Sequence, residues 1–273
     1  MPVMLLPMPS ERYMPMLKRA DLTDLQEIRS LCQGSIIGTR ILCYVLAYGF
    51  DRDFLEVWVV KEEYKATGVI VRFYDDVTLL CDKAADVNQL DAFIGMFYFK
   101  SFTCTADICS RLGFKNAVLK KGYRFNGDIN DESCDLLEED DYRKAYNLIS
   151  AEIPDSFSNE KDAYLSFLSD FTFRKRRELA RGVCTHYEGD LSSVALTSAE
   201  TDNAAIISGV ACDRQLQKKG LGKKTVLSLV KILSEKNKEA YVIALNESAE
   251  GFYEHIGFEE VEKIAFIERE NDV

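Results

Sequence analysis

Apolar and polar residues follow one another along this chain in two distinct patterns. Short runs that are apolar throughout or at every second position predict strands, and apolar residues three and four positions apart predict helices. The clearest helical pattern covers residues 221–236, where Val226, Leu229, Val230 and Leu233 share one face. In the first half of the chain, strands are predicted at residues 14–19, 54–61, 68–73, 77–81, 101–105 and 117–125, and helices after a cap at Asp21 or Thr23, at 37–48, at 87–96 and just before Gly113.

The second half of the chain repeats this order of predicted elements. A polar segment, residues 126–133, separates the halves, and its Asn-Gly and Asn-Asp pairs are typical of turns. Residues 105–114 and 249–258 also share a Gly-Phe pair and several apolar positions. We therefore expect a tandem repeat, with domains at residues 1–126 and 127–273. The predicted strands of the second half are 134–137, 182–187, 192–198, 204–212, 240–245 and 261–268, and its predicted helices are 140–150, 160–181, 221–236 and 247–255.

The size and charge of the chain narrow the classes of function. At roughly 150 residues per domain, a chain of 273 residues corresponds to about two domains. Hydrophobic residues make up 47% and charged residues 29%, which excludes a disordered or fibrous chain. The net charge of −11 disfavours general binding to nucleic acid or to an anionic membrane, and we expect neither as a partner. A local basic patch can still hold a small anion.

Cysteine and histidine usage indicates a reducing environment and disfavours a metal centre. None of the eight cysteines forms a Cys-x-x-Cys pair, and the chain has only two histidines. We therefore expect free, mostly buried thiols and no metal cofactor. The first nine residues are apolar but contain three prolines and no basic residue, unlike a secretory signal. Since no run approaches the ~20 apolar residues of a membrane span, a cytoplasmic location is expected.

The candidate chemistry begins in residues 206–222. An apolar strand leads into a polar turn and then into residues 217–222 (Gln-Lys-Lys-Gly-Leu-Gly), directly before a predicted helix. A helix start carries free N–H groups and the positive end of the dipole, and glycine lets the backbone approach a bulky anion. The pattern therefore predicts a phosphate-binding loop made of main chain, although an ordinary strand-to-helix loop is the alternative. Positive charge is supplied there by Lys218, Lys219, Lys223 and Lys224.

A second motif follows this loop. Asn246 ends the next predicted strand, Tyr253 lies on the following short helix, and Gly257-Phe258 ends that helix. Together the two motifs resemble the signature of the GNAT superfamily of acyl-CoA N-acyltransferases, a Q/R-x-x-G-x-G/A loop followed by N-x-x-A-x-x-[FL]-Y-x-x-x-G-F. The motifs cover residues 204–258, and the order of elements extends the resemblance over 134–268. The resemblance implies an α/β (α+β) GNAT fold, with a mixed, mostly antiparallel central sheet flanked by helices, in two GNAT-like domains in tandem.

The resemblance implies a role for each matching residue. The backbone amides of residues 217–222 would hold the pyrophosphate of coenzyme A. The strand edge at 210–212 would pair with the pantetheine arm and polarise the thioester carbonyl. Asn246 would hydrogen-bond the pantetheine or order the separation of the strands, and Tyr253 would protonate the leaving thiolate. The residues implied to contact acetyl-CoA are Val210, Ala211, Cys212, Gln217, Lys218, Lys219, Gly220, Leu221, Gly222, Lys223, Asn246 and Phe252.

Several of these roles have a structural alternative. Tyr253 is otherwise a core aromatic residue, and Asn246 is otherwise only the N-cap of the next helix. Cys212 is expected to fill space, because the superfamily transfers the acyl group directly to the amine. His186 and His255 have no evident orienting partner and are expected to be structural.

The base that deprotonates the acceptor amine is left open. A primary amine has a pKa of about 10.4 and must lose a proton before it attacks. Members of the superfamily often carry a glutamate on the central strand, but residues 204–212 and 240–245 contain no carboxylate. Proton removal through ordered water, ending at a backbone carbonyl, is therefore preferred. The carboxylates that remain as candidates are Asp213, Glu188, Asp190 and Glu200.

The first half lacks the cofactor motif. Its strand at 77–81 is followed by Asp-Lys-Ala-Ala-Asp (82–86), whose aspartates would repel a pyrophosphate, and Cys109 stands at the position of Tyr253. We expect this half to have lost cofactor binding, to pack against the second half and to shape the acceptor pocket. The aromatic residues that contribute to that pocket, or instead to the core of the half, are Tyr44, Tyr48, Trp58 and Phe73.

The leading interpretation is an N-acetyltransferase that moves an acetyl group from acetyl-CoA directly to a primary amine of a small molecule or peptide. The acidic charge balance mildly favours a cationic acceptor. One alternative is a catalytically idle acyl-CoA-binding sensor or interaction module, and Tyr253 argues against it, since a sensor needs no acid. A transferase for another acyl-CoA or for an aminoacyl donor is a further alternative. The sequence identifies neither the acceptor nor the oligomeric state.

Overall fold

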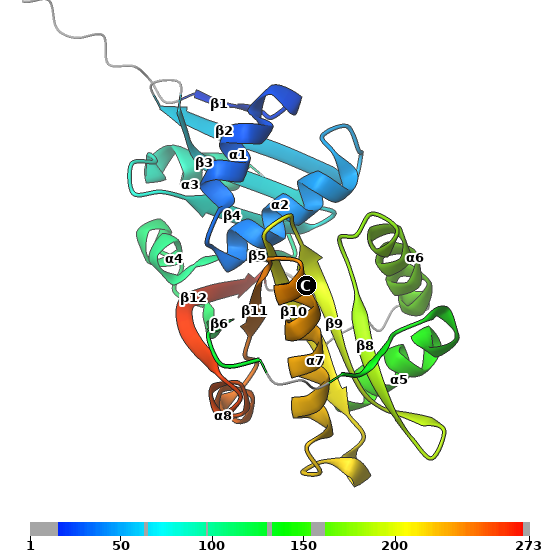
Figure 1. The fold of residues 1–273 in the computed structure, drawn as a ribbon. Coiled ribbons are helices and arrows are strands. Elements are labelled where there is room, and N and C mark those ends of the chain that lie inside the picture. Colours follow the sequence, from blue (N-terminus) through cyan, green and yellow to red (C-terminus); the bar gives the residue numbers. More distant parts are fainter. Residues whose placement is uncertain (1–15, 63–64, 97, 130–132, 154–161, 270–273) are drawn as a thin grey trace, which may run out of the picture.

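The computed structural model describes residues 16–62, 65–96, 98–129, 133–153 and 162–269 (Figure 1). In the first half the predicted elements are present, each close to its expected bounds. Asp21, one of the two predicted caps, caps the short 3-10 helix that leads into the first α-helix. The elements are β1 (Met16–Arg19), α1 (Leu25–Cys32), α2 (Ile36–Tyr48), β2 (Leu55–Glu62), β3 (Lys65–Phe73), β4 (Asp76–Cys81), α3 (Val87–Ile94), β5 (Ser101–Thr105), α4 (Ala106–Leu112) and β6 (Val118–Phe125).

The second half contains the same order of elements. The helix predicted at 160–181 differs in length, because it ends at Lys175. Glu178 adopts a left-handed backbone with φ of 59°, and the N–H of Leu179 turns back to the carbonyl of Arg174. The elements are β7 (Asp135–Leu136), α5 (Tyr142–Glu152), α6 (Ala163–Lys175), β8 (Gly182–Tyr187), β9 (Asp190–Glu200), β10 (Ala204–Cys212), α7 (Leu221–Glu235), β11 (Glu239–Ile243), α8 (Glu247–His255) and β12 (Phe258–Glu268).

These strands form one continuous twelve-stranded sheet. Their order is β1-β2-β3-β4-β5-β12-β6-β11-β10-β9-β8-β7. Two neighbouring pairs, β4–β5 and β10–β11, are parallel, and the other pairs are antiparallel. The predicted mixed, mostly antiparallel sheet flanked by helices is therefore confirmed.

The two halves exchange their last strands at the centre of this sheet. β6, from the first half, lies between β11 and β12 of the second half. β12 in turn lies between β6 and β5, and it pairs with β5 from Ile264↔Thr105 to Glu268↔Ser101. Counted inward from either edge of the sheet, the strands of each half therefore follow one another in the same order, except that β6 and β12 have exchanged places. The division expected at residues 126 and 127 lies between two copies of one element order, but both copies share a single sheet.

Helices cover both faces of the sheet. Alternate residues of β2 show this, because Val57 and Val59 pack with α1 and α2, whereas Val60 packs with α3 and α4. In the second half, α5 and α6 lie on the face that carries α1 and α2, which we call the α2 face. Helices α7 and α8 lie with α3 and α4 on the opposite face, the α7 face. Among the described helices, none has both the length and the apolarity needed to cross a membrane.

A half-buried carboxylate joins the halves on the α2 face. Glu262 of β12 accepts hydrogen bonds from the Ser35 hydroxyl (3.0 Å) and from the N–H of Ile36 (3.1 Å) at the start of α2. A Cβ at Gly122 of β6 would lie 2.4 Å from Cδ1 of Ile36, so glycine is needed for this close approach. The start of α2 is therefore fixed on the exchanged strands.

Aromatic rings fill the contact between α2 and α6. Tyr44 stacks on Phe73 with ring centroids 4.5 Å apart, and Tyr48 stacks on Phe173 of α6 at 5.2 Å. Trp58 lies on the α7 face, in the cluster that contains α3. Of the four aromatic residues suggested for an acceptor pocket, Tyr48 thus packs against the second half, Tyr44 and Phe73 stack beside it within the first half, and Trp58 packs in the core of the first half.

The cysteines are free thiols, as expected. Six of the eight are buried, and the other two, Cys134 and Cys212, are half-buried. Burial raises the pKa of Cys32 to about 12 and also raises that of Cys212. These thiols are therefore protonated at neutral pH and poor nucleophiles.

Candidate active site

β10 and β11 run side by side over only part of their lengths. They pair in parallel from Ala204↔Glu239 to Ile207↔Val242, and beyond this point no pairing between them is found in the described residues. Residues 204–207 are buried, whereas 208–210 are partly exposed. The edge of β10 that faces β11 is therefore open to an extended ligand, which can bind as an added strand does.

Gly209 produces the bend in β10. Its φ of 54° lies in the left-handed region, and the pairing with β9 shifts register between Ser208 and Ala211. A Cβ at Gly209 would lie 3.1 Å from Cδ1 of Ile149 in α5. Both the backbone angle and the packing thus favour glycine here, and the resulting irregularity coincides with the separation of the strands.

The predicted contact residues of β10 lie on alternate sides of the sheet. Val210 packs toward α7 and α8, and Ala211 packs toward α5 and α6. Cys212 is half-buried, and its raised pKa agrees with the expectation that it fills space. These residues therefore offer a ligand between the strands their backbone groups rather than their side chains.

The loop after β10 ends at the start of α7, which carries no side-chain cap. Lys218 and Gly220 adopt left-handed conformations, with φ of 62° and 83°. Gly220 is the N-cap residue, and Leu221 is the first residue of α7. The free N–H groups and the helix dipole favour an anion at this position. The backbone geometry is therefore the one expected from residues 217–222.

Glu152, the last residue of α5, holds this loop. Its Oε2 accepts hydrogen bonds from Nε of Arg214 (3.2 Å) and Nε2 of Gln217 (3.3 Å). Nε2 of Gln217 also donates to the carbonyl of Cys212 (3.2 Å). The Gln217 side chain is thus used within the loop, and its backbone remains for a ligand. Sequence patterns do not single out Glu152, because it resembles any glutamate near the end of a surface helix.

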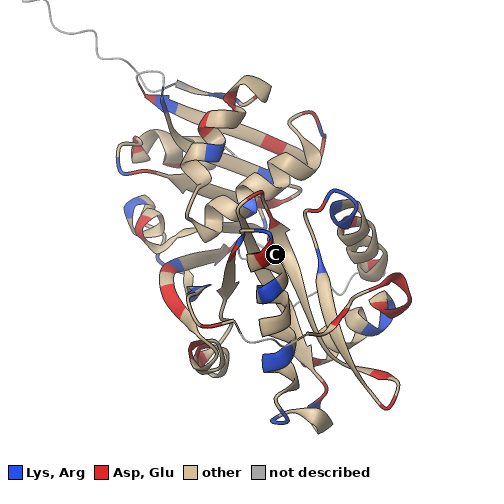
Figure 2. Cartoon of the chain, viewed as in Figure 1, with Lys and Arg blue, Asp and Glu red and all other residues tan. Residues whose placement is uncertain are grey.

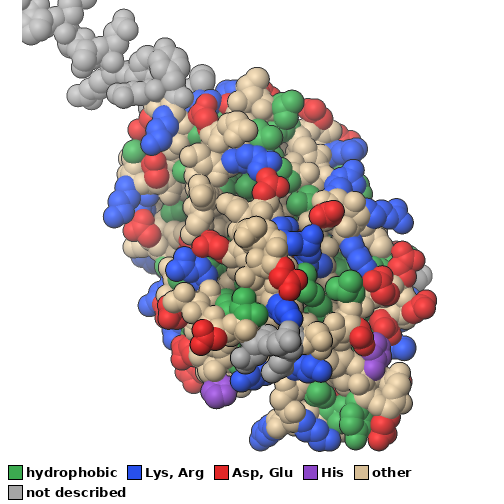
Figure 3. Space-filling view, in the orientation of Figure 1, with side chains coloured by type: hydrophobic (Ala, Val, Ile, Leu, Met, Phe, Trp, Pro, Cys, Tyr) green, Lys and Arg blue, Asp and Glu red, His purple; other side chains and the backbone are tan. Residues whose placement is uncertain are grey.

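Basic side chains surround the loop. Lys218, Lys219 and Lys224 are exposed, and Lys223 is half-buried. Nζ of Lys219 lies 5.4 Å from the ring centroid of Tyr187, at the end of β8. Figures 2 and 3 show basic side chains at the end of the molecule where α7 begins, whereas acidic and basic groups are mixed elsewhere on the face in view. This local positive charge suits an anionic ligand.

Tyr253 lies on α8, in a packed aromatic environment. Its residue is 8% exposed, and its ring centroid lies 5.3 Å from that of Phe252 and 5.5 Å from that of Phe258. Burial raises the pKa of the hydroxyl to about 12, so the phenol is neutral at physiological pH. Within the described part of the chain, no residue hydrogen-bonds this hydroxyl. It therefore remains available as a donor to a ligand.

The two sequence motifs meet where the start of α7 lies against Phe252 of α8. A Cβ at Gly222 would lie 3.9 Å from Cζ of Phe252, so the start of α7 lies against α8. Asn246 is the N-cap of α8, and its Oδ1 accepts the N–H of Ala249 at 2.9 Å. The capping role considered for Asn246 is therefore present, and no described residue accepts a hydrogen bond from its side-chain NH2 group.

The carboxylates considered as bases differ in their surroundings. Glu200 is fully buried, pairs with two basic side chains, and lies opposite Ala205, away from the separated part of β10. Asp213 caps the 3-10 turn that follows it. Glu188 and Asp190 are exposed in the turn between β8 and β9. The position of Glu200 removes it from the candidates, and a water path remains the preferred route.

The expectation that His186 lacks an orienting partner is wrong. Its Nε2 lies 3.0 Å from Oδ2 of Asp141, and its Nδ1 lies 3.4 Å from Oδ2 of Asp135. Both aspartates are more than forty residues away in the chain, so sequence spacing gives no sign of these contacts. His255 is exposed at the end of α8.

In the first half, side chains of that half close the position that corresponds to the cofactor loop. β4 and β5 pair in parallel only from Asp76↔Ser101 to Thr78↔Thr103. The carboxylate of Asp86 then caps α3, and the guanidinium of Arg111 in α4 donates to the carbonyls of Asp82 and Ala85, each at 3.0 Å. Cys109 is buried in α4. An acidic cap where α7 has a glycine disfavours an anion at this place.

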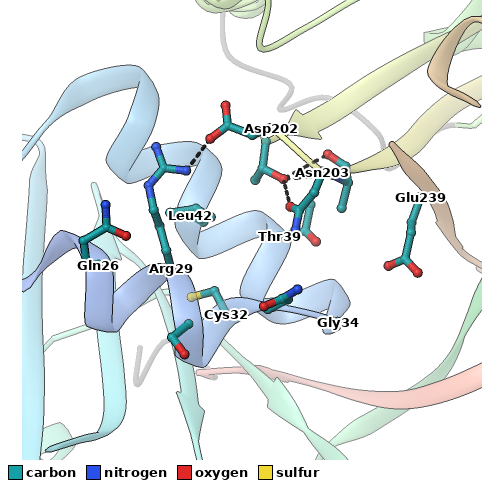
Figure 4. A pocket seen from close by; sticks show the side chains of 13 residues that line it. Gln26, Arg29, Cys32, Gly34, Thr39, Leu42, Asp202, Asn203 and Glu239 are labelled. Atoms are coloured by element: carbon teal, nitrogen blue, oxygen red, sulfur yellow. Dashed lines mark hydrogen bonds and ion pairs between the residues drawn. The ribbon is translucent and has the colours of Figure 1, made fainter. Parts of the chain in front are cut away.

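A cavity of about 330 Å³ lies at the opposite end of β10 from the separated part (Figure 4). It opens between α1, the turn into α2 and the turn between β9 and β10. Arg29 of the first half pairs with Asp202 of the second across it, and Thr201 donates to Asn203. None of the predicted acetyl-CoA contacts lines this cavity, so it is a junction between the halves rather than the proposed cofactor site.

Solved structures with this architecture define the class of fold. A Drosophila protein is 11% identical and covers 94% of this chain and 100% of its own, with a TM-score of 0.63. A GCN5-related N-acetyltransferase from Sphaerobacter thermophilus is 12% identical, covering 94% and 96%, with a TM-score of 0.62. A tandem GNAT protein from the clavulanic acid biosynthesis pathway is 11% identical, covering 93% and 98%, with a TM-score of 0.61. The chain therefore has the GNAT fold.

One family model also matches the second half. Residues 182–267, which run from β8 into β12, match the family described as FR47-like protein. No curated protein matches the chain. The match contains both the loop before α7 and the segment of Tyr253, and the resemblance to the GNAT superfamily is confirmed for the fold.

Proposed function

We propose that this chain is an acyl-CoA-dependent N-acyltransferase that transfers an acetyl group from acetyl-CoA to a primary amine of a small molecule or peptide. One observation carries the proposal: the separated edge of β10, the start of α7 and the Tyr253 hydroxyl, which has no hydrogen-bond partner among the described residues, belong to adjacent elements. An anion-binding helix start alone is common in proteins. Its combination with an open strand edge and a buried proton donor suits a phosphorylated thioester.

Acetyl-CoA is proposed to bind with its pyrophosphate at the backbone amides of residues 217–222. Lys218, Lys219 and Lys223 supply positive charge there, and Gly220 and Gly222 keep the approach free of side chains. The pantetheine arm lies along residues 210–212 and takes the backbone groups that β11 leaves free. Asn246 and Phe252 contact the arm from the side of α8.

The proposed transfer forms a C–N bond and breaks the C–S bond of the thioester. A neutral amine attacks the thioester carbonyl, and a backbone N–H of β10 stabilises the negative charge on its oxygen. The amine loses its proton through ordered water. The electron pair of the broken bond remains on sulfur, where the Tyr253 hydroxyl meets it. The products are an amide and free coenzyme A.

The raised pKa of Tyr253 defines how this residue acts. At about 12, the phenol is a weaker acid than a free thiol, whose pKa is about 8.5. A strong hydrogen bond to the developing thiolate therefore stabilises the transition state, and complete proton transfer is not required before the thiolate leaves. The same pKa keeps the donor protonated throughout the physiological range.

The two halves have different proposed roles. Residues 127–273 hold the cofactor loop, whereas residues 1–126 have lost cofactor binding and supply β6 and the α2 contact. Because Asp86 and Arg111 close the first half, we expect one acetyl-CoA site per chain. The free buried thiols suit a reducing, cytoplasmic setting.

The test is calorimetric titration of acetyl-CoA into the full chain, followed by a panel of amines with release of free thiol as the readout. One site per chain and thiol release that depends on an amine are the expected results. Absence of binding would overturn the proposal. Binding without turnover of any amine would favour the catalytically idle acyl-CoA-binding module instead.

A further inference from the structure

Three side chains that commonly bind metals meet at the edge of the sheet, beside the start of α5. Cys184 and His186 are two residues apart on β8, and both are directed toward the α2 face. Asp141 directly precedes α5. Its Oδ, the Sγ of Cys184 and a ring nitrogen of His186 all lie within 4.8 Å of one another. A strand and a helix start, both fixed by packing, thus bring together one oxygen, one sulfur and one nitrogen.

The distances between these atoms are near those between the ligand atoms of a tetrahedral metal site. Ordinary bond lengths to Zn²⁺ separate its ligand atoms by roughly 3.3–3.8 Å. Oδ2 of Asp141 and Nε2 of His186 are 3.0 Å apart, and the sulfur of Cys184 lies within 4.8 Å of a carboxylate oxygen of Asp141 and of a ring nitrogen of His186. Side-chain movements of about an ångström therefore suffice to bring the three ligand atoms to the distances that surround an ion.

Asp141 does not use its carboxylate as a helix cap. It occupies the N-cap position of α5, but its side chain makes no hydrogen bond to the backbone of the helix. Its Oδ1 pairs with Lys144 at the surface (3.2 Å), and its Oδ2 is directed to His186. Residues 139–141 form a short 3-10 helix that continues into α5, so Asp141 lies within helical backbone and its carboxylate is left for the contact with the ring.

A second carboxylate orients the imidazole. Oδ2 of Asp135, on β7, lies 3.4 Å from Nδ1 of His186, the nitrogen on the other side of the ring from Asp141. Metal-bound histidines commonly donate this second N–H to a carboxylate, which fixes the tautomer and the ring orientation. Asp135 is not one of the three candidate ligands, and its contact with Nδ1 leaves Nε2 on the side of Asp141.

We propose that Asp141, Cys184 and His186 bind a divalent transition-metal ion, with Zn²⁺ the best match to one oxygen, one sulfur and one nitrogen ligand. Water takes the fourth position, and Asp135 holds the remaining N–H of the ring. As the metal–sulfur bond forms, the Cys184 thiol releases its proton to solvent. The ion compensates the negative charge of Asp135 and Asp141 around a sulfur that is fully buried.

The site acts on the rest of the molecule through α5. The ion fixes the first turn of this helix, while Ile149 packs against Gly209 and Glu152 holds the loop at its other end. Metal binding at the sheet edge therefore positions the helix that supports both the bend in β10 and the loop before α7. The proposed role of the metal ion is structural, because its three protein ligands lie near the start of α5 and Glu152 lies at the end of this helix.

The test is titration of Co²⁺ into the full, reduced chain after treatment with a chelator. A thiolate-to-cobalt charge-transfer absorption that saturates at one ion per chain is expected, as is its loss in Cys184→Ser. Cys212→Ser, which changes a half-buried thiol outside the cluster, is the matched control and keeps the absorption. Absence of the absorption in the wild type, or its persistence in Cys184→Ser, would overturn the proposal.

Two surface variants keep the test valid if Cys184→Ser does not fold. Asp135→Asn should weaken Co²⁺ binding by about 10–100-fold, the usual effect of losing an orienting carboxylate. His186→Gln should abolish stoichiometric binding. Zn²⁺ should also raise the unfolding temperature of the wild type and not that of His186→Gln. Equal affinities in the wild type and both variants would show that Asp135 and His186 form only ion pairs with their neighbours.

Discussion

The hydroxyl of the buried residue Tyr253, which no described residue hydrogen-bonds, is the single group on which the proposed chemistry depends most. For Tyr253→Phe we expect turnover to fall by about 10²–10⁴-fold, the usual contribution of a positioned acid. The affinity for acetyl-CoA should stay the same, because the ring packing with Phe252 and Phe258 is kept. Steady-state kinetics and calorimetry check the two parts separately. Tyr98→Phe, at an exposed position, is the control, and equal turnover in both variants would assign thiolate protonation to water.

Substitutions at Asn246 can separate the two roles considered for it, capping α8 and binding acetyl-CoA. Aspartate at this position keeps the side-chain oxygen that caps α8 but removes the NH2 donor and adds a negative charge. Asn246→Asp should therefore keep the stability of the wild type and lose affinity for acetyl-CoA, whereas Asn246→Ala should lose both. Thermal unfolding and calorimetry measure the two properties. Unchanged affinity in Asn246→Asp would mean that this residue serves only as the cap.

At the scale of elements, the contact of β12 with the start of α2 has a defined pH dependence. Burial raises the pKa of Glu262, although hydrogen bonds from Ser35 and from the start of α2 oppose the shift. The folded state therefore holds this proton more tightly than the unfolded state. The stabilising contribution is complete below the ordinary carboxyl pKa and is lost as the pH rises through the higher pKa of the folded state.

Glu262→Gln tests this contact, because glutamine has a similar shape and does not titrate in this range. The free energy of unfolding of the wild type relative to Glu262→Gln should be most favourable at acidic pH and should fall as the pH approaches neutrality. Denaturant unfolding at several pH values gives this difference directly. Glu268→Gln, at the exposed end of β12, should show no such trend. A difference that does not vary with pH would contradict the raised pKa.

The elements themselves follow from the sequence, because their signals are local. The apolar periodicity predicts α7 and β10 within a few residues. Helices α2 and α4 end directly before Gly49 and Gly113, the glycines that predict these ends. The pairing of the strands is not local. The pattern of β6 shows a strand, but nothing in it shows that its neighbours are β11 and β12 rather than the strands of its own half.

The residues of the candidate site also fall into two groups, those that local sequence patterns predict and those that they do not. The loop at residues 217–222 and the segment of Tyr253 are contiguous motifs, and both are visible in the sequence. Glu152, which supports the loop, and the cluster of Asp141 with His186 depend on contacts between distant segments. Such contacts are set by packing between segments far apart in the chain, so local sequence patterns give no sign of them.

At the scale of the whole molecule, the shared sheet predicts that both halves unfold together. Trp58 is the only tryptophan and lies in the first half, so its fluorescence reports that half alone. Leu229→Ala, in the core beneath α7, should cost about 2–5 kcal/mol. We expect the unfolding midpoint seen by Trp58 to shift as much as that seen by circular dichroism. Ser234→Ala, exposed on the same helix, should shift neither, and a transition of Trp58 that ignores Leu229→Ala would show that the halves unfold independently.

The traded strands also determine when a newly made chain can complete its sheet. β5 ends at Thr105, and its partner β12 begins only at Phe258, close to the end of the chain. At ~5–20 residues per second, the edge of β5 waits on the order of 10–30 s on the ribosome with unpaired backbone groups. Such an edge is open to pairing with other chains during that time. A chain that terminates before residue 258 therefore leaves unfinished the half that was synthesised first.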